Sequence, residues 1–239
     1  MLSVTAAEKQ WLFSEDALMS TGSMRKEQLV QELARLPEER LQEVLHFVES
    51  LLRQEQQARA ETLLHERGPE QDPLLQYSGG VAHGSLARDS AQELYGTEGV
   101  AIFIATWGWL TLRDRREARH RQVDRFYREG RRRRDSLYTD DYVLDETITL
   151  LFRRLPFVRA QESLQYIQQA IAEGYLRLEW ITPQRFEKAI ELRYRFQDRP
   201  RISFMDLTSM VVMSEREIEA ILTEDDHFLH VGMDFRKVP

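Results

Sequence analysis

The chain has 239 residues, of which 42% are hydrophobic and 31% charged, with a net charge of −7. This composition is that of a soluble globular protein large enough to bury a substantial core. The absence of cysteine excludes disulfides and thiolate metal sites, and the longest apolar stretch, residues 99–112, is too short to span a membrane. Because the N-terminus also lacks the pattern of a signal peptide, we expect a cytoplasmic protein that does not contact a membrane.

The charge is distributed unevenly along the chain. Residues 1–98 hold 9 basic and 17 acidic residues, whereas residues 99–239 hold 24 and 23. Within the second half, residues 113–134 carry 11 arginines against four acids, which predicts a strongly positive face. A positive face attracts phosphate groups, and the acidic first half of the same chain could cover it.

The first sixty residues divide into a leader and a helical region. Residues 1–23 show weak patterning, and we interpret them as a flexible leader without an assigned function. In residues 24–60, leucine and valine recur at spacings of three, four and seven, and Pro37 stands at the first position of a second helix. This pattern predicts two short amphipathic helices. They either pack on each other or bind a partner, because a hairpin of this size buries its apolar stripe poorly.

The next segment, residues 61–98, is rich in Gly, Pro, Ser and Asp and has few apolar residues. A stretch of this length without regular structure is unusual unless it lies against another part of the protein. We interpret it as an extended strap that docks on the second half through Leu74, Leu75, Leu86 and Leu94.

The second half, residues 99–239, alternates between strand and helix patterns. Strands are expected at residues 100–105, 137–139, 176–180 and 218–222, and helices at residues 119–133, 142–154, 162–173, 183–196 and 203–213. This alternation predicts an α/β fold with a parallel sheet and helices on both faces. We favour core packing for Trp107 and Trp109 over stacking on nucleic-acid bases.

Three carboxylates stand next to strongly apolar sequence. Glu146 lies in "DYVLDETITLLFRR", Asp206 in "RISFMDLTSMVVM" and Asp225 in "AILTEDDHF". Each taken alone has an explanation as a helix cap or a turn residue, which is the interpretation we prefer for other acids of these segments. Those other acids are Asp140, Asp141, Asp145 and Asp226. Together, however, three acids beside apolar sequence suit a hard divalent cation such as Mg²⁺ or Mn²⁺.

The segments "YTDDYVLDETITLL", "DRPRISFMDLTSMVVM" and "AILTEDDHFLHVGM" resemble those of PIN-domain ribonucleases, specifically the VapC-type toxins of prokaryotic toxin–antitoxin pairs. The resemblance covers residues 100–239. It implies a PIN-like sheet flanked by helices and a phosphodiesterase that cuts RNA with metal-activated water. It also implies that Glu146, Asp206 and Asp225 are metal ligands.

The resemblance has one clear departure. The family's first segment is a strand that ends in Asp followed by Thr or Ser, and "FIATWGWL" has Ala105 in place of that Asp. The resemblance further makes Thr106 and Ser203 supporting residues around the metal ligands. We interpret His227 as a structural residue of the "DDHF" turn and assign it no role. The loss of an acid at Ala105 leaves a site that binds one cation weakly or none.

The first half is similar to small VapB-like antitoxins. "LARLPEERLQEVLHFVESLL" looks like their helical part, and "DPLLQYSGGVAHGSLARDSAQELYG" is similar to the tail with which they wrap their toxin. The chain therefore reads as an antitoxin joined to a toxin, with a helical segment at 24–60, a strap at 61–98 and a PIN-like domain at 99–239. In the strap, Arg88 is expected near the acidic site, because an arginine can take over the charge of a metal ion.

Two functions follow from these features. The first is a toxin–antitoxin fusion whose metal-dependent endoribonuclease half is inactive or impaired at Ala105 and covered by its own antitoxin segment. The alternative is a non-catalytic PIN-fold module that binds RNA or a protein partner. We expect self-association through the PIN half or the helices. DNA binding by the first half is disfavoured, because that half is acidic and lacks a clear DNA-reading motif.

Overall fold

The computed structural model describes residues 30–37, 40–41, 43–45, 47–48, 51–52, 55, 71–78 and 99–239. The chain divides into two compact units, Met1–Gln56 and Gln57–Pro239. In the first unit, residues 30–33 and the described positions between 40 and 55 are helical, and Leu45, Val48 and Leu52 are exposed. Helix is thus present within residues 24–60, where the sequence predicts it.

The second unit is built around a five-stranded parallel sheet. Its strands are β1 (Ala101–Ile104), β2 (Ser136–Asp140), β3 (Arg177–Glu179), β4 (Ala220–Leu222) and β5 (Arg236–Val238). Their order in the sheet is β3-β2-β1-β4-β5, and every pair is parallel. The central strand β1 is flanked on both sides, with Phe103 in register with Tyr138 and with Ile221. The α/β fold with a parallel sheet that the sequence predicts is confirmed.

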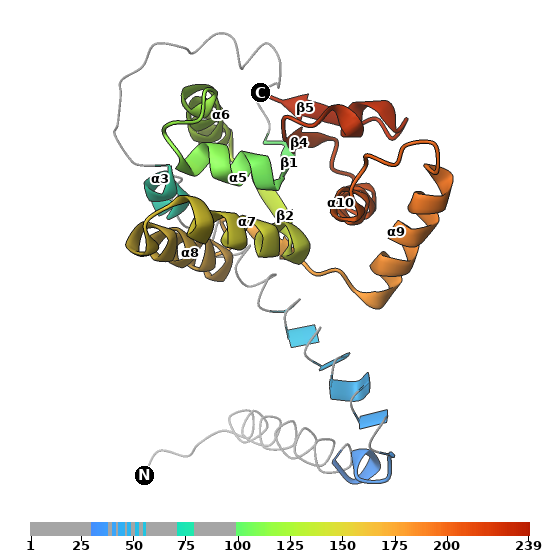
Figure 1. Cartoon of the computed structure of the whole chain (residues 1–239). Coiled ribbons are helices and arrows are strands. Elements are labelled where there is room, and N and C mark those ends of the chain that lie inside the picture. The colour runs from blue at the N-terminus through green and yellow to red at the C-terminus, as the bar shows by residue number, and fades with distance from the viewer. Residues whose placement is uncertain are drawn as a thin grey trace, which may run out of the picture. The chain divides into compact units, whose positions relative to one another are not determined.

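Helices cover this sheet. They are α5 (Thr106–Arg113), α6 (His120–Arg133), α7 (Asp141–Arg154), α8 (Phe157–Ala172), α9 (Pro183–Arg195) and α10 (Phe204–Glu215). Figure 1 shows α5 and α6 on one side of the sheet and α9 and α10 on the other. Helix α10 is buried through its middle, since all residues from Leu207 to Met213 are buried.

The apolar run that begins at Val100 divides into two elements, β1 and α5. The turn between them is tight because Ala105 already has extended backbone geometry and caps the helix that begins at Thr106. Gly108 lets α5 approach the sheet closely, since a Cβ at this position would lie 2.7 Å from the backbone oxygen of Leu222. The strand and the helix together bring the start of α5 to the end of β4.

Several elements differ from the expected pattern, among them α5, which is not one of the expected helices. Strand β5 is not among the predicted strands, because "FRKV" offers too few apolar residues for a strand pattern, yet it pairs with β4 at the edge of the sheet. Helix α8 begins at Phe157, five residues before the expected start at Glu162. The apolar residues of its first turn, Phe157 and Val158, are exposed. They therefore do not continue the apolar stripe from which the helix was predicted.

The described part of the expected strap is a short helix, α3 (Leu74–Tyr77), rather than extended chain. Asp72 accepts a hydrogen bond from the backbone N–H of Leu74, which is how a polar residue typically begins a helical turn. Leu74 and Tyr77 are fully buried in the core of the second unit, and Leu75 packs against it. Of the other expected anchors, Leu86 and Leu94 lie outside the described residues, as does Arg88.

Tyr77 connects this segment to α5. Its hydroxyl donates to the backbone oxygen of Trp109 at 2.9 Å, and the two rings meet edge to face at 5.7 Å. Trp109 itself is buried and donates through its indole N–H to Thr139 on β2. Trp109 therefore packs in the core, as the sequence predicts, whereas Trp107 is half-buried below the guanidinium group of Arg119.

Arginines of the run between residues 113 and 134 hold the segment 71–78 in place. Arg113 is buried and donates to the backbone oxygen of Tyr77 at 3.0 Å and to Ser163 Oγ on α8 at 2.7 Å. On α6, Arg131 Nε lies 2.7 Å from a carboxylate oxygen of the buried Asp72. Part of the arginine run is therefore committed to the fold, and its positive charge is smaller on the surface than its sequence suggests.

Candidate functional site

The carboxyl ends of the parallel strands form one edge of the sheet, where ligands bind in open α/β folds. Strand β1 delivers Ala105 to this edge, and the Ala105 N–H donates to the oxygen of Leu222 at the end of β4. Ala105 is the N-cap of α5, and no side chain caps this helix. The position at which an acid would both cap α5 and face the edge thus carries a methyl group.

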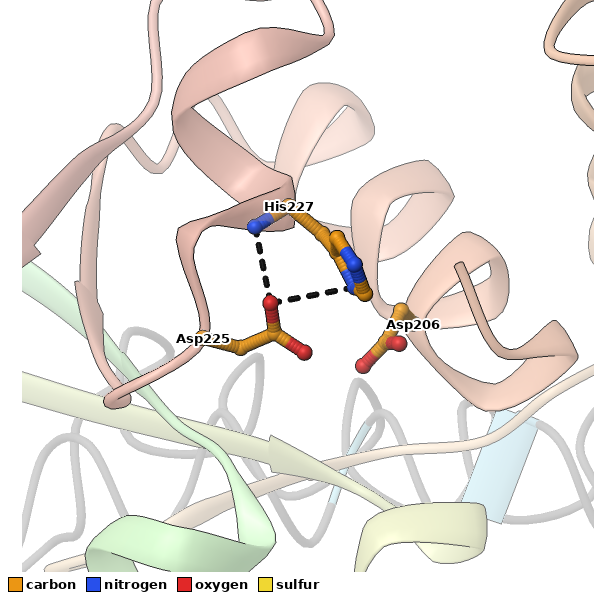
Figure 2. A group of neighbouring side chains, drawn as sticks. All are labelled: Asp206, Asp225 and His227. Carbon is orange, nitrogen blue, oxygen red and sulfur yellow. Dashed lines mark hydrogen bonds and ion pairs between the residues drawn. The ribbon is translucent and has the colours of Figure 1, made fainter. Parts of the chain in front are cut away.

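Asp206, Asp225 and His227 come together at this edge. Asp206 lies in the first turn of α10, and the other two residues lie at the start of the 3-10 helix η2 (Asp226–His230), which follows β4. One ligand atom from each residue lies within 4.8 Å of the others. Figure 2 shows the two carboxyl groups pointing toward each other, with the imidazole ring alongside.

The carboxylate of Asp206 is held by the start of its own helix. Asp206 Oδ2 accepts hydrogen bonds from the backbone N–H and the hydroxyl of Ser203, while the Asp206 N–H donates to Ser203 Oγ. This reciprocal arrangement is a capping box. Among the described residues, no group donates to Asp206 Oδ1, which leaves that oxygen available. Ser203, to which the sequence analysis gives a supporting role, therefore orients the carboxylate of Asp206.

Asp225 is held in a similar way by the chain around it. Its side chain caps η2 by accepting a hydrogen bond from the His227 N–H at 2.8 Å. Its backbone N–H donates to Thr223 Oγ1 at 3.1 Å. The Nδ1 atom of His227 lies 3.0 Å from Asp225 Oδ1, which is an ion-pair distance without the alignment of a hydrogen bond.

Burial raises the pKa of Asp206 above its ordinary value of 3.8, and the nearby charge of Asp225 raises it further. The hydrogen bonds from Ser203 act in the opposite direction but do not cancel these effects. Two carboxylates that face each other repel when both are ionised, and a cation between them removes this repulsion. The electrostatics of the pair therefore favours a bound cation.

Glu146 stands apart from this group. It is exposed on α7, and the group formed by Asp206, Asp225 and His227 does not include it. The buried face of α7 is formed by other residues, among them Val143, Thr147 and Leu151. Of the three acids proposed from the sequence, the structure brings together two and adds His227, to which the sequence assigns no role.

Two hydroxyl groups lie next to the edge. Thr106 is the first residue of α5 and is buried, and within the described part of the chain no group hydrogen-bonds to its Oγ1 atom. A buried polar atom without a partner is costly and often marks a place where a ligand or water binds. Thr139, on β2, is instead satisfied, because it donates to the oxygen of Ile104.

Asp140 is a buried acid at the end of β2 and caps α7, as the sequence predicts. It accepts hydrogen bonds from the Val143 N–H and from Ser209 Oγ, each at 2.7 Å. Burial raises its pKa to about 6, since these two hydrogen bonds do not offset the loss of water around the charge. Asp140 therefore connects β2 to α10, the helix that carries Asp206.

This raised pKa makes the stability of the protein depend on pH. Between the unfolded pKa near 4 and the folded pKa of about 6, the folded state binds the additional proton, so the free energy of unfolding decreases as pH rises through this window. The shift corresponds to about 3 kcal/mol. We expect Asp140→Asn, which keeps the cap, to make this decrease smaller when denaturant unfolding is measured at about pH 4.5 and about pH 7.5. An equal decrease in both proteins would exclude Asp140 as its source.

The order and direction of the strands, with helices on both faces, give the second unit a PIN-like α/β fold. The fold that the sequence segments imply is thereby confirmed. The chain is similar to the crystal structure of VapC20 from Mycobacterium tuberculosis, a sarcin-ricin loop cleaving toxin. The similarity has 30% sequence identity and a TM-score of 0.47, and it covers 55% of this chain and 95% of that one.

Comparisons with protein families and with curated proteins found no match. Among the described residues, no helix is both long and apolar enough to cross a membrane.

Proposed function

We propose that the chain is a toxin–antitoxin fusion whose second unit is a PIN-type, metal-dependent endoribonuclease that is impaired at Ala105. The single observation that supports this most strongly is the place of Ala105. It lies at the end of the central strand and at the start of α5, on the edge where Asp206 and Asp225 face each other. A carboxylate at this position would complete an acidic site, and the methyl group does not.

The residues present suit a divalent cation. Carboxylate oxygens are the ligands that Mg²⁺ and Mn²⁺ prefer, and Asp206 and Asp225 offer one each while their other hydrogen bonds hold them in place. A bound cation would activate water and stabilise the charge of the phosphoryl oxygens. In this proposal Ser203 orients Asp206, Thr106 supports the edge from α5, and Glu146 is a ligand only if its exposed side chain turns inward.

RNA is the proposed substrate, because three segments of the second unit resemble those of PIN-domain ribonucleases. The sarcin-ricin loop is the target of VapC20, and nothing around the edge assigns that target to this chain. For this chain we propose only the class, single-stranded RNA, since the described residues around the edge do not indicate a sequence. The proposed location is the cytoplasm, where RNA is accessible.

The antitoxin part of the proposal is supported by the segment 71–78. This segment lies before the PIN-like domain in sequence, yet Leu74 and Tyr77 are buried in its core and Asp72 pairs with Arg131. The proposed strap continues from there toward the site, with Leu86 and Leu94 as anchors and Arg88 as the residue that faces the acids. Self-association of the fusion remains part of the proposal, whereas DNA binding is not.

The decisive experiment restores the acid. We expect the Ala105→Asp chain to cleave single-stranded RNA in the presence of Mg²⁺ or Mn²⁺, and the unaltered chain to show little or no cleavage. Both proteins are assayed as full chains and with the strap anchors removed by Leu86→Ser, Arg88→Ala and Leu94→Ser. Cleavage that requires both the Ala105→Asp substitution and removal of the anchors supports an inhibitory strap.

The alternative function is a non-catalytic PIN-fold module that binds RNA or a protein. Ala105 and the exposed position of Glu146 are the observations in its favour, because they leave only two carboxylates, Asp206 and Asp225, in the candidate metal-binding group. Failure of the Ala105→Asp chain to cleave RNA in every form tested, combined with retained RNA binding in a filter assay, would establish this alternative and overturn the ribonuclease.

A further inference from the structure

We propose that His227 is a metal ligand that compensates for the acid missing at Ala105, so that the site selects a transition-metal cation over Mg²⁺. This inference rests on the proposed function, because it concerns the metal of the same site. It goes further in naming a nitrogen ligand and the metal preference that follows from it.

The geometry places a ring nitrogen of His227 among the two carboxylates. One atom from each of the three side chains lies within 4.8 Å of the others. Ligands at about 2.1 Å from a common ion lie at most about 4.2 Å apart, so small side-chain rotations are sufficient to close the group around a cation. The three residues come from the start of α10 and the start of η2. Each of them is therefore positioned by a helix terminus.

The backbone around His227 supports this role. Its N–H donates to Asp225 Oδ1, which fixes the distance between the two residues and leaves Asp225 Oδ2 for a cation. The Nδ1 atom of the ring has no well-aligned hydrogen-bond partner among the described residues, although it lies 3.0 Å from Asp225.

A nitrogen ligand changes which cation the site prefers. Mg²⁺ binds oxygen ligands and retains its water molecules, whereas imidazole binds transition metals well. Two carboxylates and one imidazole form a mixed set of oxygen and nitrogen donors. Such a set favours Mn²⁺, Co²⁺ or Zn²⁺ over Mg²⁺.

The test is metal binding to the full chain, measured without RNA. We expect titration calorimetry to show that Mn²⁺ binds at least about tenfold more tightly than Mg²⁺, and that His227→Ala weakens Mn²⁺ binding at least about tenfold. Pulsed electron paramagnetic resonance of the Mn²⁺ complex is expected to show coupling to a ¹⁴N nucleus that His227→Ala abolishes. His230→Ala is the matched control, because His230 is exposed and lies three residues further along the same short helix.

Two results would overturn the inference. One is absence of Mn²⁺ binding to the unaltered chain, and the other is Mn²⁺ binding with the same affinity and spectrum in the His227→Ala chain. Neither result decides the proposed function, since the Ala105→Asp chain could still cleave RNA with Mg²⁺. Conversely, binding that depends on His227 in a protein whose Ala105→Asp chain does not cleave RNA would leave the inference standing and exclude the ribonuclease.

Discussion

The Ala105→Asp chain with its strap anchors removed is expected to cleave RNA at least about 100-fold faster than the otherwise identical chain with Ala105. This magnitude follows from the effect of a single preorganised group at a reacting centre, about 2.7 to 4 kcal/mol in the activation barrier. The added carboxylate would lie at the end of β1, beside the end of β4. It brings one more oxygen and one more negative charge to a cation at this edge.

Ala105→Asn is the matched control for this effect. Asparagine caps a helix about as well as aspartate, so both variants are expected to stabilise the start of α5 by about 1 kcal/mol relative to alanine. Only aspartate adds a charge. Cleavage by the aspartate variant alone attributes the activity to the carboxylate, whereas equal cleavage by both variants would attribute it to the helix cap and contradict the electrostatic argument.

Removal of residues 1–98 is expected to unfold the remaining protein, although the PIN-like pattern begins only at residue 99. The deletion takes away Leu74 and Tyr77, which are fully buried. Emptying such sites costs about 2–5 kcal/mol each, which together is comparable with the whole stability of a typical domain. A chain that begins at Gln57, the start of the second compact unit, is the control and is expected to remain folded.

Urea unfolding followed by tryptophan fluorescence distinguishes these chains, because Trp109 contacts Tyr77 directly. The chain from residue 99 is expected to show no cooperative transition or a greatly lowered midpoint. Equal midpoints for the two chains would mean that the segment 71–78 contributes nothing to the fold.

A single substitution tests the same docking in the full chain. Asp72→Asn keeps the shape of the side chain but leaves the buried guanidinium group of Arg131 without its counter-charge, which costs about 3–5 kcal/mol. Asp124→Asn removes the partner of Arg128 in a pair that is about one quarter exposed, and we expect a loss of less than about 1 kcal/mol. Similar losses in both variants, measured by urea unfolding, would contradict the special role of Asp72.

The centre of the sheet could be predicted because β1 and β4 are almost completely buried and therefore appear as short apolar runs. Strand β5 escaped prediction because "FRKV" offers too few apolar residues for a strand pattern. The helix α3 escaped because its four residues are too few for a helical period, and its stability comes from contacts with α5 and α8 that the sequence does not display.

The site was partly predictable for a geometric reason. Asp225 follows a strand and Asp206 begins a helix that returns to the same edge, so their meeting follows from the parallel topology. The position of Glu146 depends instead on the rotation of α7, which is set by its buried face. His227 was missed because a histidine after an acid in a turn is an ordinary structural pattern. The second acid beside it in the structure, Asp206, is distant in sequence, so the sequence did not indicate that the two residues meet.

The packing of α3 also has a consequence for the order in which the chain is synthesised. The groups that receive the segment 71–78 belong to α5, α6 and α8, and α8 ends at Ala172. Asp206 and Asp225 follow later in the chain. On a ribosome, where domains form from the N-terminus onward, every one of these contact partners therefore leaves the exit tunnel before either of the two acids does. The segment 71–78 can therefore dock on its contact partners before Asp206 and Asp225 have left the ribosome.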